Sequence, residues 1–350
     1  MKNLMLTLAV TLGLGLLAAC GEKGSSFSLL QDSNIFYQNA SNLNSKIDIL
    51  WVIDDSGSMA SSQQNVANNL NSFISDFVTK GYDFKIAVVD TGAWRTQFSG
   101  DNNQSRFRAG NVPNQGPVYV ITPSTPNLIP TFMANVLRGT SGTGDERMHS
   151  SFKQALINPL NAGFMRSDSH LAIINLTDED DFSSSVSTNP GGSHNYSNPN
   201  LYSIPSFVTW LDTYTGTNGA TRRYSVSTVS IQDTACMNQL NAQSPGRIIS
   251  TRVNELVDAT GGIKVSLCGN FASGLSSIAA NIIELSTQFF LDREPIPESI
   301  EVFVNDVLVN QSATNGWTYN AQALSIVFHG PAIPTQGAKI FVKYDPKTIQ

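Results

Sequence analysis

Apolar residues gather in short runs that alternate with amphipathic stretches along most of the chain. The first run, 47–53 (Ile-Asp-Ile-Leu-Trp-Val-Ile), lacks a regular apolar-polar alternation, which is typical of a central strand covered on both faces. Strands that alternate with helices predict an α/β fold with a mostly parallel sheet flanked by helices. We expect strands at 47–53, 84–89, 171–176, 224–230 and 263–267, and helices at 61–79, 128–137, 148–156, 204–214, 248–259 and 271–290.

Two segments interrupt this rhythm, 92–127 and 183–200, and their Gly, Pro, Ser and Asn content predicts long surface loops. After Pro295 the pattern changes to short β-like runs, with Asn305-Asp306 placed as a hairpin turn between two of them. We expect a small antiparallel β unit there, with strands at 300–304, 307–309, 325–328 and 340–344. The chain is thus predicted to contain a main domain at 46–294 and a β domain at 295–350.

The candidate chemistry follows the first strand. Asp54, Ser56 and Ser58 alternate along an extended segment, so their side chains point the same way. Asp178 follows the strand at 171–176, and the carboxyl ends of parallel strands meet at one edge of the sheet. Carboxylate and hydroxyl oxygens suit Mg²⁺ better than Zn²⁺. The alternative is that Asp54 and Ser56 only cap the next helix.

A glycine-rich segment, 138–146, lies between these two strand ends and carries two threonines, Thr140 and Thr143. The three segments, in this order, resemble the metal-ion-dependent adhesion site of the von Willebrand factor A family over residues 46–291. The resemblance implies a Rossmann-like sandwich that holds one Mg²⁺, or Mn²⁺ or Ca²⁺ in its place. The implied ligands, with Thr143 favoured over Thr140 because it is nearer the following helix, are Asp54, Ser56, Ser58, Thr143 and Asp178.

In this family one coordination position stays open for an acidic side chain of a protein partner. The resemblance therefore implies metal-dependent protein binding, as in adhesion, and not catalysis. The alternative is an envelope assembly or scaffold protein that uses the same site to hold a neighbouring subunit. Another rival is an aspartic protease, because Asp55-Ser56-Gly57 and Asp90-Thr91-Gly92 each follow a strand. Only 35 residues separate these triplets, too few for the β-rich lobe that such an enzyme needs.

The N-terminus predicts where the protein is found. Lys2 precedes an apolar run too short to span a membrane, and Leu17-Ala18-Ala19-Cys20 resembles a bacterial lipobox. We expect residues 1–19 to be a signal peptide, Cys20 to carry lipid, and residues 20–45, rich in Ser, Asn and Gln, to be a flexible tether. Gly21 in place of Asp favours the outer membrane of the cell envelope. The lipid would then be the protein's only membrane anchor.

The net charge bears on the class of partner, and the cysteines bear on disulfide formation. Loss of residues 1–19 removes Lys2 and leaves 20 Lys and Arg against 27 Asp and Glu, a formal charge of −7, which disfavours nucleic acid as a partner. Cys236 and Cys268 remain, and an extracytoplasmic compartment allows them to form a disulfide.

Overall fold

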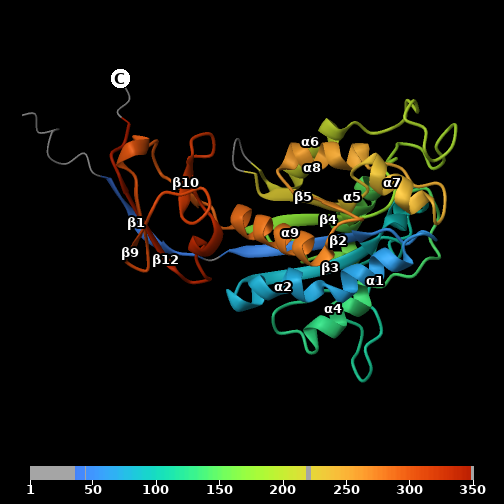
Figure 1. Cartoon of the computed structure of the whole chain (residues 1–350), viewed down its shortest axis with the longest axis horizontal. Coiled ribbons are helices and arrows are strands. Elements are labelled where there is room, and N and C mark those ends of the chain that lie inside the picture. Colours follow the sequence, from blue (N-terminus) through green and yellow to red (C-terminus); the bar gives the residue numbers. More distant parts are fainter. Residues whose placement is uncertain (1–35, 44, 218–221, 348–350) are drawn as a thin grey trace, which may run out of the picture.

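A parallel sheet forms the centre of the larger part of the molecule (Figure 1). The computed structural model describes residues 36–43, 45–217 and 222–347. Within them, the strand order β3-β2-β4-β5-β6 is that of a doubly wound α/β fold, with β2 at the point where the order reverses. The strands are β2 (Lys46–Ile53), β3 (Asp83–Asp90), β4 (Ser169–Leu176), β5 (Tyr224–Ser230) and β6 (Lys264–Ser266).

Helices cover both faces of this sheet, which explains why β2 is apolar on both sides. Ile49 and Trp51 pack into one core cluster with α1, α2, α4 and α9, whereas Leu50 and Val52 pack into a second with α5, α6 and α8. Figure 1 shows α6 and α8 on one side and α1, α2 and α4 on the other. The helices are α1 (Ala60–Asn68), α2 (Leu70–Thr79), α3 (Thr96–Ser99), α4 (Leu128–Val136), α5 (Met148–Ile157), α6 (Ile204–Thr215), α7 (Thr234–Asn241), α8 (Thr251–Thr260) and α9 (Phe271–Ser286).

The predicted α/β class and parallel sheet are confirmed, and several details of the element prediction are wrong. The single helix expected at 61–79 is two helices, because the backbone of Asn69 leaves the helical conformation between α1 and α2. The helix expected at 271–290 ends at Ser286, and Phe289–Phe290 is a strand, β7, paired with β11. Helix α7 was not expected; the Asp233 side chain caps it by accepting from Cys236 N at 2.8 Å.

The β unit contains two antiparallel sheets, ordered β1-β12-β8-β9 and β10-β11-β7. The hairpin turn predicted at Asn305-Asp306 is confirmed, and both residues have the positive φ that a type I′ turn requires. The strands are β1 (Phe36–Asn42), β7 (Phe289–Phe290), β8 (Glu301–Val304), β9 (Val307–Val309), β10 (Trp317–Asn320), β11 (Ser325–Phe328) and β12 (Lys339–Tyr344).

Strand β1 corrects the prediction of a flexible tether over Phe36–Asn42, while residues 20–35 of that predicted tether lie outside the described residues. It pairs antiparallel with β12 and forms one edge of its sheet. An edge strand is held by backbone hydrogen bonds to its neighbour, so a polar sequence such as Phe-Tyr-Gln-Asn-Ala-Ser-Asn can adopt it. The segment just before the main domain therefore belongs to the β unit. The signal peptide at 1–19 and Cys20 lie outside the described residues.

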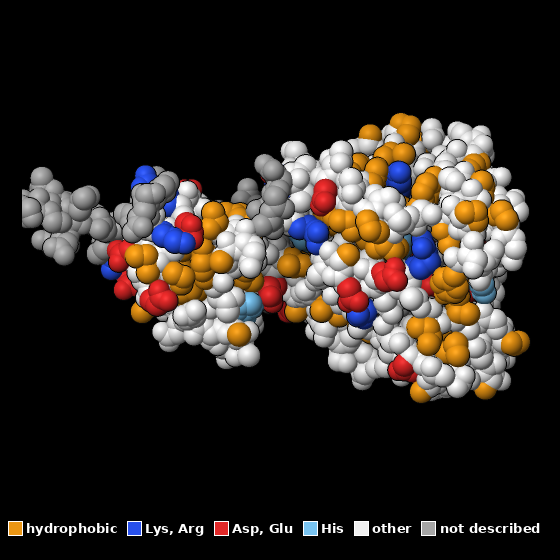
Figure 2. All heavy atoms as spheres, turned by 90° about the horizontal axis from the view of Figure 1, so that it is seen from above, with side chains coloured by type: hydrophobic (Ala, Val, Ile, Leu, Met, Phe, Trp, Pro, Cys, Tyr) orange, Lys and Arg blue, Asp and Glu red, His pale blue; other side chains and the backbone are white. Residues whose placement is uncertain are grey.

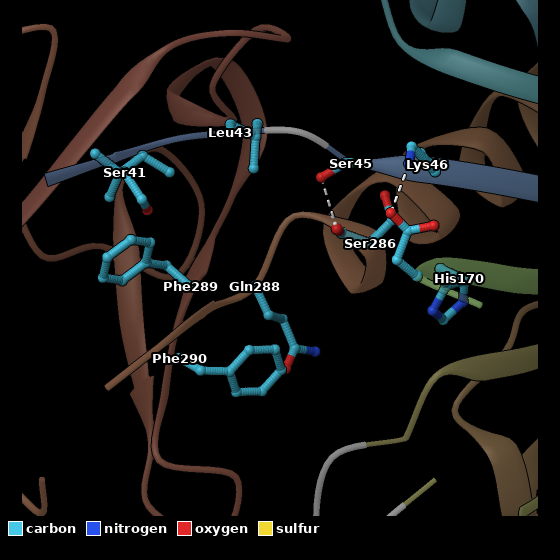
Figure 3. Close-up of a pocket in the computed structure, with 11 residues that line it drawn as sticks. Ser41, Leu43, Ser45, Lys46, His170, Ser286, Gln288, Phe289 and Phe290 are labelled. Atoms are coloured by element: carbon cyan, nitrogen blue, oxygen red, sulfur yellow. Dashed lines mark hydrogen bonds and ion pairs between the residues drawn. The ribbon is translucent and has the colours of Figure 1, made fainter. Parts of the chain in front are cut away.

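The β unit packs against the end of the α/β part, and Figure 2 shows the two as separate masses joined by a narrower region. Tyr82 donates from its hydroxyl to Pro334 O at 2.6 Å, and Gln336 N donates to Lys80 O at 3.1 Å. A cavity of about 320 Å³ lies at the junction, lined among others by Lys46, which pairs with Asp168 (Figure 3). Among the described residues, no helix is long and apolar enough to cross a membrane.

Candidate functional site

Asp54 stands at the carboxyl end of β2 and is fully buried. Its Oδ1 accepts from Ser56 N and its Oδ2 from Thr177 Oγ1, both at 2.8 Å. The backbone N–H of Asp54 donates to Leu176 O at 2.9 Å, which joins the ends of β2 and β4. Burial, followed by the nearby charge of Asp178, raises the pKa of Asp54 to about 7. A buried carboxylate with such a pKa is suited to binding a cation that compensates its charge.

The two serines and the second aspartate converge on this point. Ser56 Oγ lies 3.3 Å from Ser58 Oγ, and Ser58 Oγ donates to Asp178 Oδ1 at 3.0 Å. The parallel register places Ile53 of β2 opposite Leu176 of β4, so both strands end at the same level. The structure thus brings together four of the five residues that the sequence singled out for metal binding. They are Asp54, Ser56, Ser58 and Asp178.

Arg247 forms an ion pair with Asp178 that was not predicted from the sequence. Its Nε lies 2.6 Å from Asp178 Oδ2, and the two side chains are only 8% and 2% exposed. Its Nη1 donates to Leu240 O, and two hydrogen bonds with the Asn241 side chain hold its backbone. The disulfide predicted between Cys236 and Cys268 is confirmed, and it fastens α7, which precedes this segment. Arg247 therefore neutralises Asp178 from a firmly held position.

The glycine-rich segment is attached to the site by its backbone. Gln63 bridges the two, because its Nε2 donates to both Asp54 O and Gly139 O at 2.8 Å. Gly142 N donates to Asp55 O at 2.7 Å, and a Cβ on Gly142 would lie 2.4 Å from Asp55 Oδ1. The approach is too close for any side chain at residue 142. The segment therefore lies directly against the loop that follows β2.

Neither threonine of this segment joins the cluster. Thr143 is exposed and its hydroxyl accepts from Arg95 Nη2 at 2.6 Å, and Thr140 is exposed as well. The structure thus does not group Thr143 with the other four residues implied by the resemblance. The backbone turns at Gly139, whose φ of +80° glycine adopts readily, and both threonines follow this turn on the exposed side of the segment.

Glu146 is the residue of this segment that points inward. It is 1% exposed, and neither oxygen of its carboxylate has a hydrogen-bond partner among the described residues. Its backbone carbonyl accepts from Phe182 N at 3.0 Å, which ties it to the loop after β4. Burial, followed by the charge of Asp54, raises the pKa of Glu146 well above its usual range. The sequence offered no signal that singles out Glu146, which lies two residues before α5 begins at Met148.

Asp180 and Asp181, which follow Asp178, have structural roles. The Asp180 oxygens accept from the backbone N–H groups of Arg252 and Val253 at the start of α8. Asp181 accepts from His149 N at 2.9 Å at the start of α5, and its Oδ2 lies 3.0 Å from His149 Nδ1. Carboxylates are favoured at helix N-termini, so both residues fasten helices to the site loop.

The arrangement of Asp90 differs from that of an aspartic protease. Its two oxygens are paired with Arg108 and Arg138, each at 2.6 Å, while Asp55 accepts from Thr91 Oγ1 at 3.4 Å. A protease dyad shares a proton between two carboxyl groups, whereas here each acid has its own partner.

The donors at the end of β2 fit a hard divalent cation. Carboxylate and hydroxyl oxygens are ligands for Mg²⁺, Mn²⁺ or Ca²⁺. Across residues 36–347, leaving out those not described, no three His, Cys, Asp or Glu side chains form a group that could hold a metal. An ion beside Asp54 would therefore need the hydroxyl oxygens of Ser56 and Ser58 as well as carboxylate oxygens.

Comparison with models of protein families gave no match, and comparison with curated proteins gave none. Among solved structures, the chain is similar to the open conformation of the pilus adhesin SpaC from Lactobacillus rhamnosus GG, with 13% identity and a TM-score of 0.43, covering 88% of this chain and 40% of that one. It is also similar to proximal thread matrix protein 1 from the mussel byssus with a zinc-occupied MIDAS motif. The identity is 13% and the TM-score 0.33, and the match covers 72% of this chain and 50% of that one. The chain thus spans half or less of the length of these two proteins. Both TM-scores are below 0.5, and it is the strand order of the chain itself that establishes its α/β fold.

Proposed function

We propose that this protein binds one divalent cation through Asp54, Ser56, Ser58 and Asp178, and that the bound ion holds an acidic side chain of a protein partner. The observation that carries the proposal is the chain of polar contacts at the end of β2. Ser58 Oγ lies within hydrogen-bond distance of both Ser56 Oγ and Asp178 Oδ1, and Asp54 is buried beside them. Four oxygen-bearing side chains from two strand ends thus face one point.

Charge explains why the ion would attract a further carboxylate. The serine hydroxyls are neutral, and Arg247 already compensates Asp178. A dication held mainly by neutral oxygens and few carboxylates keeps part of its positive charge and binds acidic ligands well. A protein side chain is the fitting source, because the long loops around this edge offer a broad contact surface. One residue of these loops that a partner could contact is Tyr196, which is 52% exposed.

The proposal includes the cell envelope as location, with Cys20 carrying lipid and residues 1–19 removed. Binding, not catalysis, is the proposed activity. A partner that proves to be another envelope component of the same cell would assign the protein to the scaffold function. A partner from a foreign surface would assign it to adhesion.

The test is calorimetric titration of Mg²⁺, Mn²⁺ and Ca²⁺ into the metal-stripped protein and its Asp54→Asn variant. We expect binding of one ion per chain in the unmodified protein and none in the variant. Asp168→Asn is the matched control, because Asp168 is an exposed acid paired with Lys46 at the opposite end of the sheet. Equal binding by Asp54→Asn and the unmodified protein would refute the proposed site.

The open coordination position has its own test with Mn²⁺. Water bound to Mn²⁺ speeds the relaxation of solvent protons, and a carboxylate that replaces this water slows it again. We expect glutarate, used as a small acidic probe, to reduce the relaxation enhancement of the Mn²⁺-loaded protein. Glutaramide, its uncharged counterpart, should leave the enhancement unchanged. No effect of glutarate would contradict the acidic-ligand part of the proposal.

A further inference from the structure

Glu146 is a buried acid without a partner at an edge where its neighbours are paired. Asp178 has Arg247 at 2.6 Å, Glu179 has His194 at 2.9 Å, and Asp90 has two arginines. Both oxygens of Glu146 are shielded from solvent and lack a hydrogen bond within the described part of the chain. A buried charge is costly unless a counter-charge or donors compensate it. The nearby hydroxyl of Thr91, which donates to Asp55, offsets the rise of the Glu146 pKa only in part, so the fold leaves a largely uncompensated acceptor at Glu146.

The position of Glu146 is fixed by the same contacts that hold the metal-site loops. Gln63 joins the beginning of its segment to Asp54 O, and Gly142 N joins the middle to Asp55 O. The carbonyl of Glu146 accepts from Phe182 N, beyond the end of β4. Three independent attachments thus place this residue between the loops that follow β2 and β4. The Glu146 carboxylate is close enough to Asp54, and less strongly to Glu179, for their charges to repel it, which places it at the same edge of the sheet as Asp54.

We propose that Glu146 is a ligand of the divalent cation, in the place that the resemblance gave to Thr143. This inference rests on the proposed function and names a further ligand of its site. The ion would be held directly by the carboxylates of Asp54 and Glu146 and by the hydroxyls of Ser56 and Ser58, and Asp178, the fourth residue of the proposed site, would act on it indirectly. Asp178 would stay bound to Arg247 and orient Ser58 through its hydrogen bond.

With Glu146 as a ligand, a second negative charge compensates the bound dication. Arg247 cancels the charge of Asp178, so Asp54 alone would leave a dication half compensated. A second carboxylate from Glu146 takes the place of the compensated Asp178, so the ion has two charged ligands, while the neutral serine hydroxyls leave it electrophilic enough to bind a partner's carboxylate. The hydroxyl of Thr143 could not do this, being neutral and bound to Arg95.

The test compares Glu146→Gln with the unmodified protein in two measurements. Glutamine keeps the shape and removes the charge, so we expect the affinity for Mg²⁺ or Mn²⁺, measured by calorimetry, to fall at least about tenfold, the scale on which metal sites respond to loss of a supporting group. In the metal-stripped protein, the same variant should unfold at a higher temperature, because an uncompensated buried acid is gone. Added Mn²⁺ should then stabilise the variant less than the unmodified protein.

Glu179→Gln is the matched control, since Glu179 is a neighbouring acid already paired with His194. A loss of affinity in Glu146→Gln alone supports ligation. Equal losses in both variants would mean that the ion responds only to the total negative charge nearby, and would overturn the proposal. Unchanged affinity in Glu146→Gln would also overturn it and make Glu146 a buried neutral acid. If Asp54→Asn loses the ion while Glu146→Gln keeps it, the proposed function stands and this inference fails.

A second variant covers the case in which Glu146→Gln does not fold. Glu146→Asp keeps the charge and withdraws it by one methylene, so it should bind the ion with reduced affinity. Glu179→Asp should bind with unchanged affinity. Full affinity in Glu146→Asp, with circular dichroism showing a folded protein, would contradict direct ligation.

Discussion

Replacing Arg247 by methionine should strongly destabilise the metal-free protein. The change removes the guanidinium that lies 2.6 Å from Asp178 and leaves this carboxylate, which is 2% exposed, buried without a counter-charge. Removing one partner of a buried ion pair costs about 3–5 kcal/mol, because the other charge stays desolvated. The hydrogen bonds from Arg247 to the carbonyls of Leu240 and Ser244 are lost as well. For a domain of about 150–250 residues this corresponds to a fall of roughly 6–20 °C in Tm.

The assay is urea unfolding of the metal-stripped protein, with the free energy of unfolding compared between variants. Lys339→Met is the control, because Lys339 forms a similar pair with Asp306 at 2.8 Å but the two side chains are 47% and 76% exposed. Exposed pairs contribute only about 0–1 kcal/mol. A loss in Arg247→Met no larger than that in Lys339→Met would refute the argument that burial makes this pair important.

A double variant separates the charge from the packing of the arginine. If the cost comes from the uncompensated carboxylate, Asp178→Asn introduced into Arg247→Met should restore much of the lost stability. If the cost comes from lost packing of the long side chain, the double variant should be as unstable as Arg247→Met. Recovery in the double variant would thus assign Arg247 its role as the counter-charge of the site.

Two further predictions concern Gly142, beside the candidate site, and His170 in β4. Gly142→Ala should weaken metal binding and destabilise the protein by about 1–3 kcal/mol, because the new Cβ would lie 2.4 Å from Asp55 Oδ1. Gly144→Ala, whose Cβ would have its nearest neighbour at 3.8 Å, should change neither the metal affinity nor the stability. Equal effects of the two substitutions in calorimetry and unfolding would contradict this prediction. Burial, followed by the charge of Arg223, lowers the pKa of His170 from 6.5 to about 3. Below pH 6.5 the unfolded chain therefore binds a proton that the folded protein does not bind. Lowering the pH from 6.5 to 4.5 should then reduce the free energy of unfolding by up to about 2.7 kcal/mol. His170→Gln should show a smaller loss between pH 6.5 and 4.5 in urea unfolding, and an unchanged slope would exclude this contribution.

The sequence was sufficient to predict the strand ends of the site and the residues that follow them. Asp54 and Asp178 each come directly after an apolar run, and parallel strands place such residues at one edge. The polar groups of Asp54, Ser56 and Ser58 converge as predicted, but through a turn in which Ser56 N donates to Asp54 Oδ1 and Met59 N to Ser56 O, and not through the extended segment that was expected. These predictions depend only on neighbours in the chain and on the direction of strands, and the structure places the four residues together.

Arg247 and Glu146 could not be predicted, because their positions depend on loops. Arg247 is 69 residues from Asp178, and its path is set by α7, the disulfide and Asn241. The sequence does show that a residue between 138 and 146 reaches the site, but it does not show which one points inward. The positive φ of Gly139 and the contact of Gly142 with Asp55 decide this, and neither follows from residue types.

The same limit explains the incorrect tether. After Phe36-Tyr37 this segment is polar and has no regular apolar alternation, so no strand was expected at Phe36–Asn42. Its conformation comes from β12, some 300 positions later in the chain, whose free edge supplies the backbone partners. Because β1 leads directly into β2, the β unit and the metal-site strand are joined through this short connection. A force on the N-terminal side of the chain, where lipid attachment is proposed, would therefore reach the β unit before it reaches the loops that hold the candidate ion.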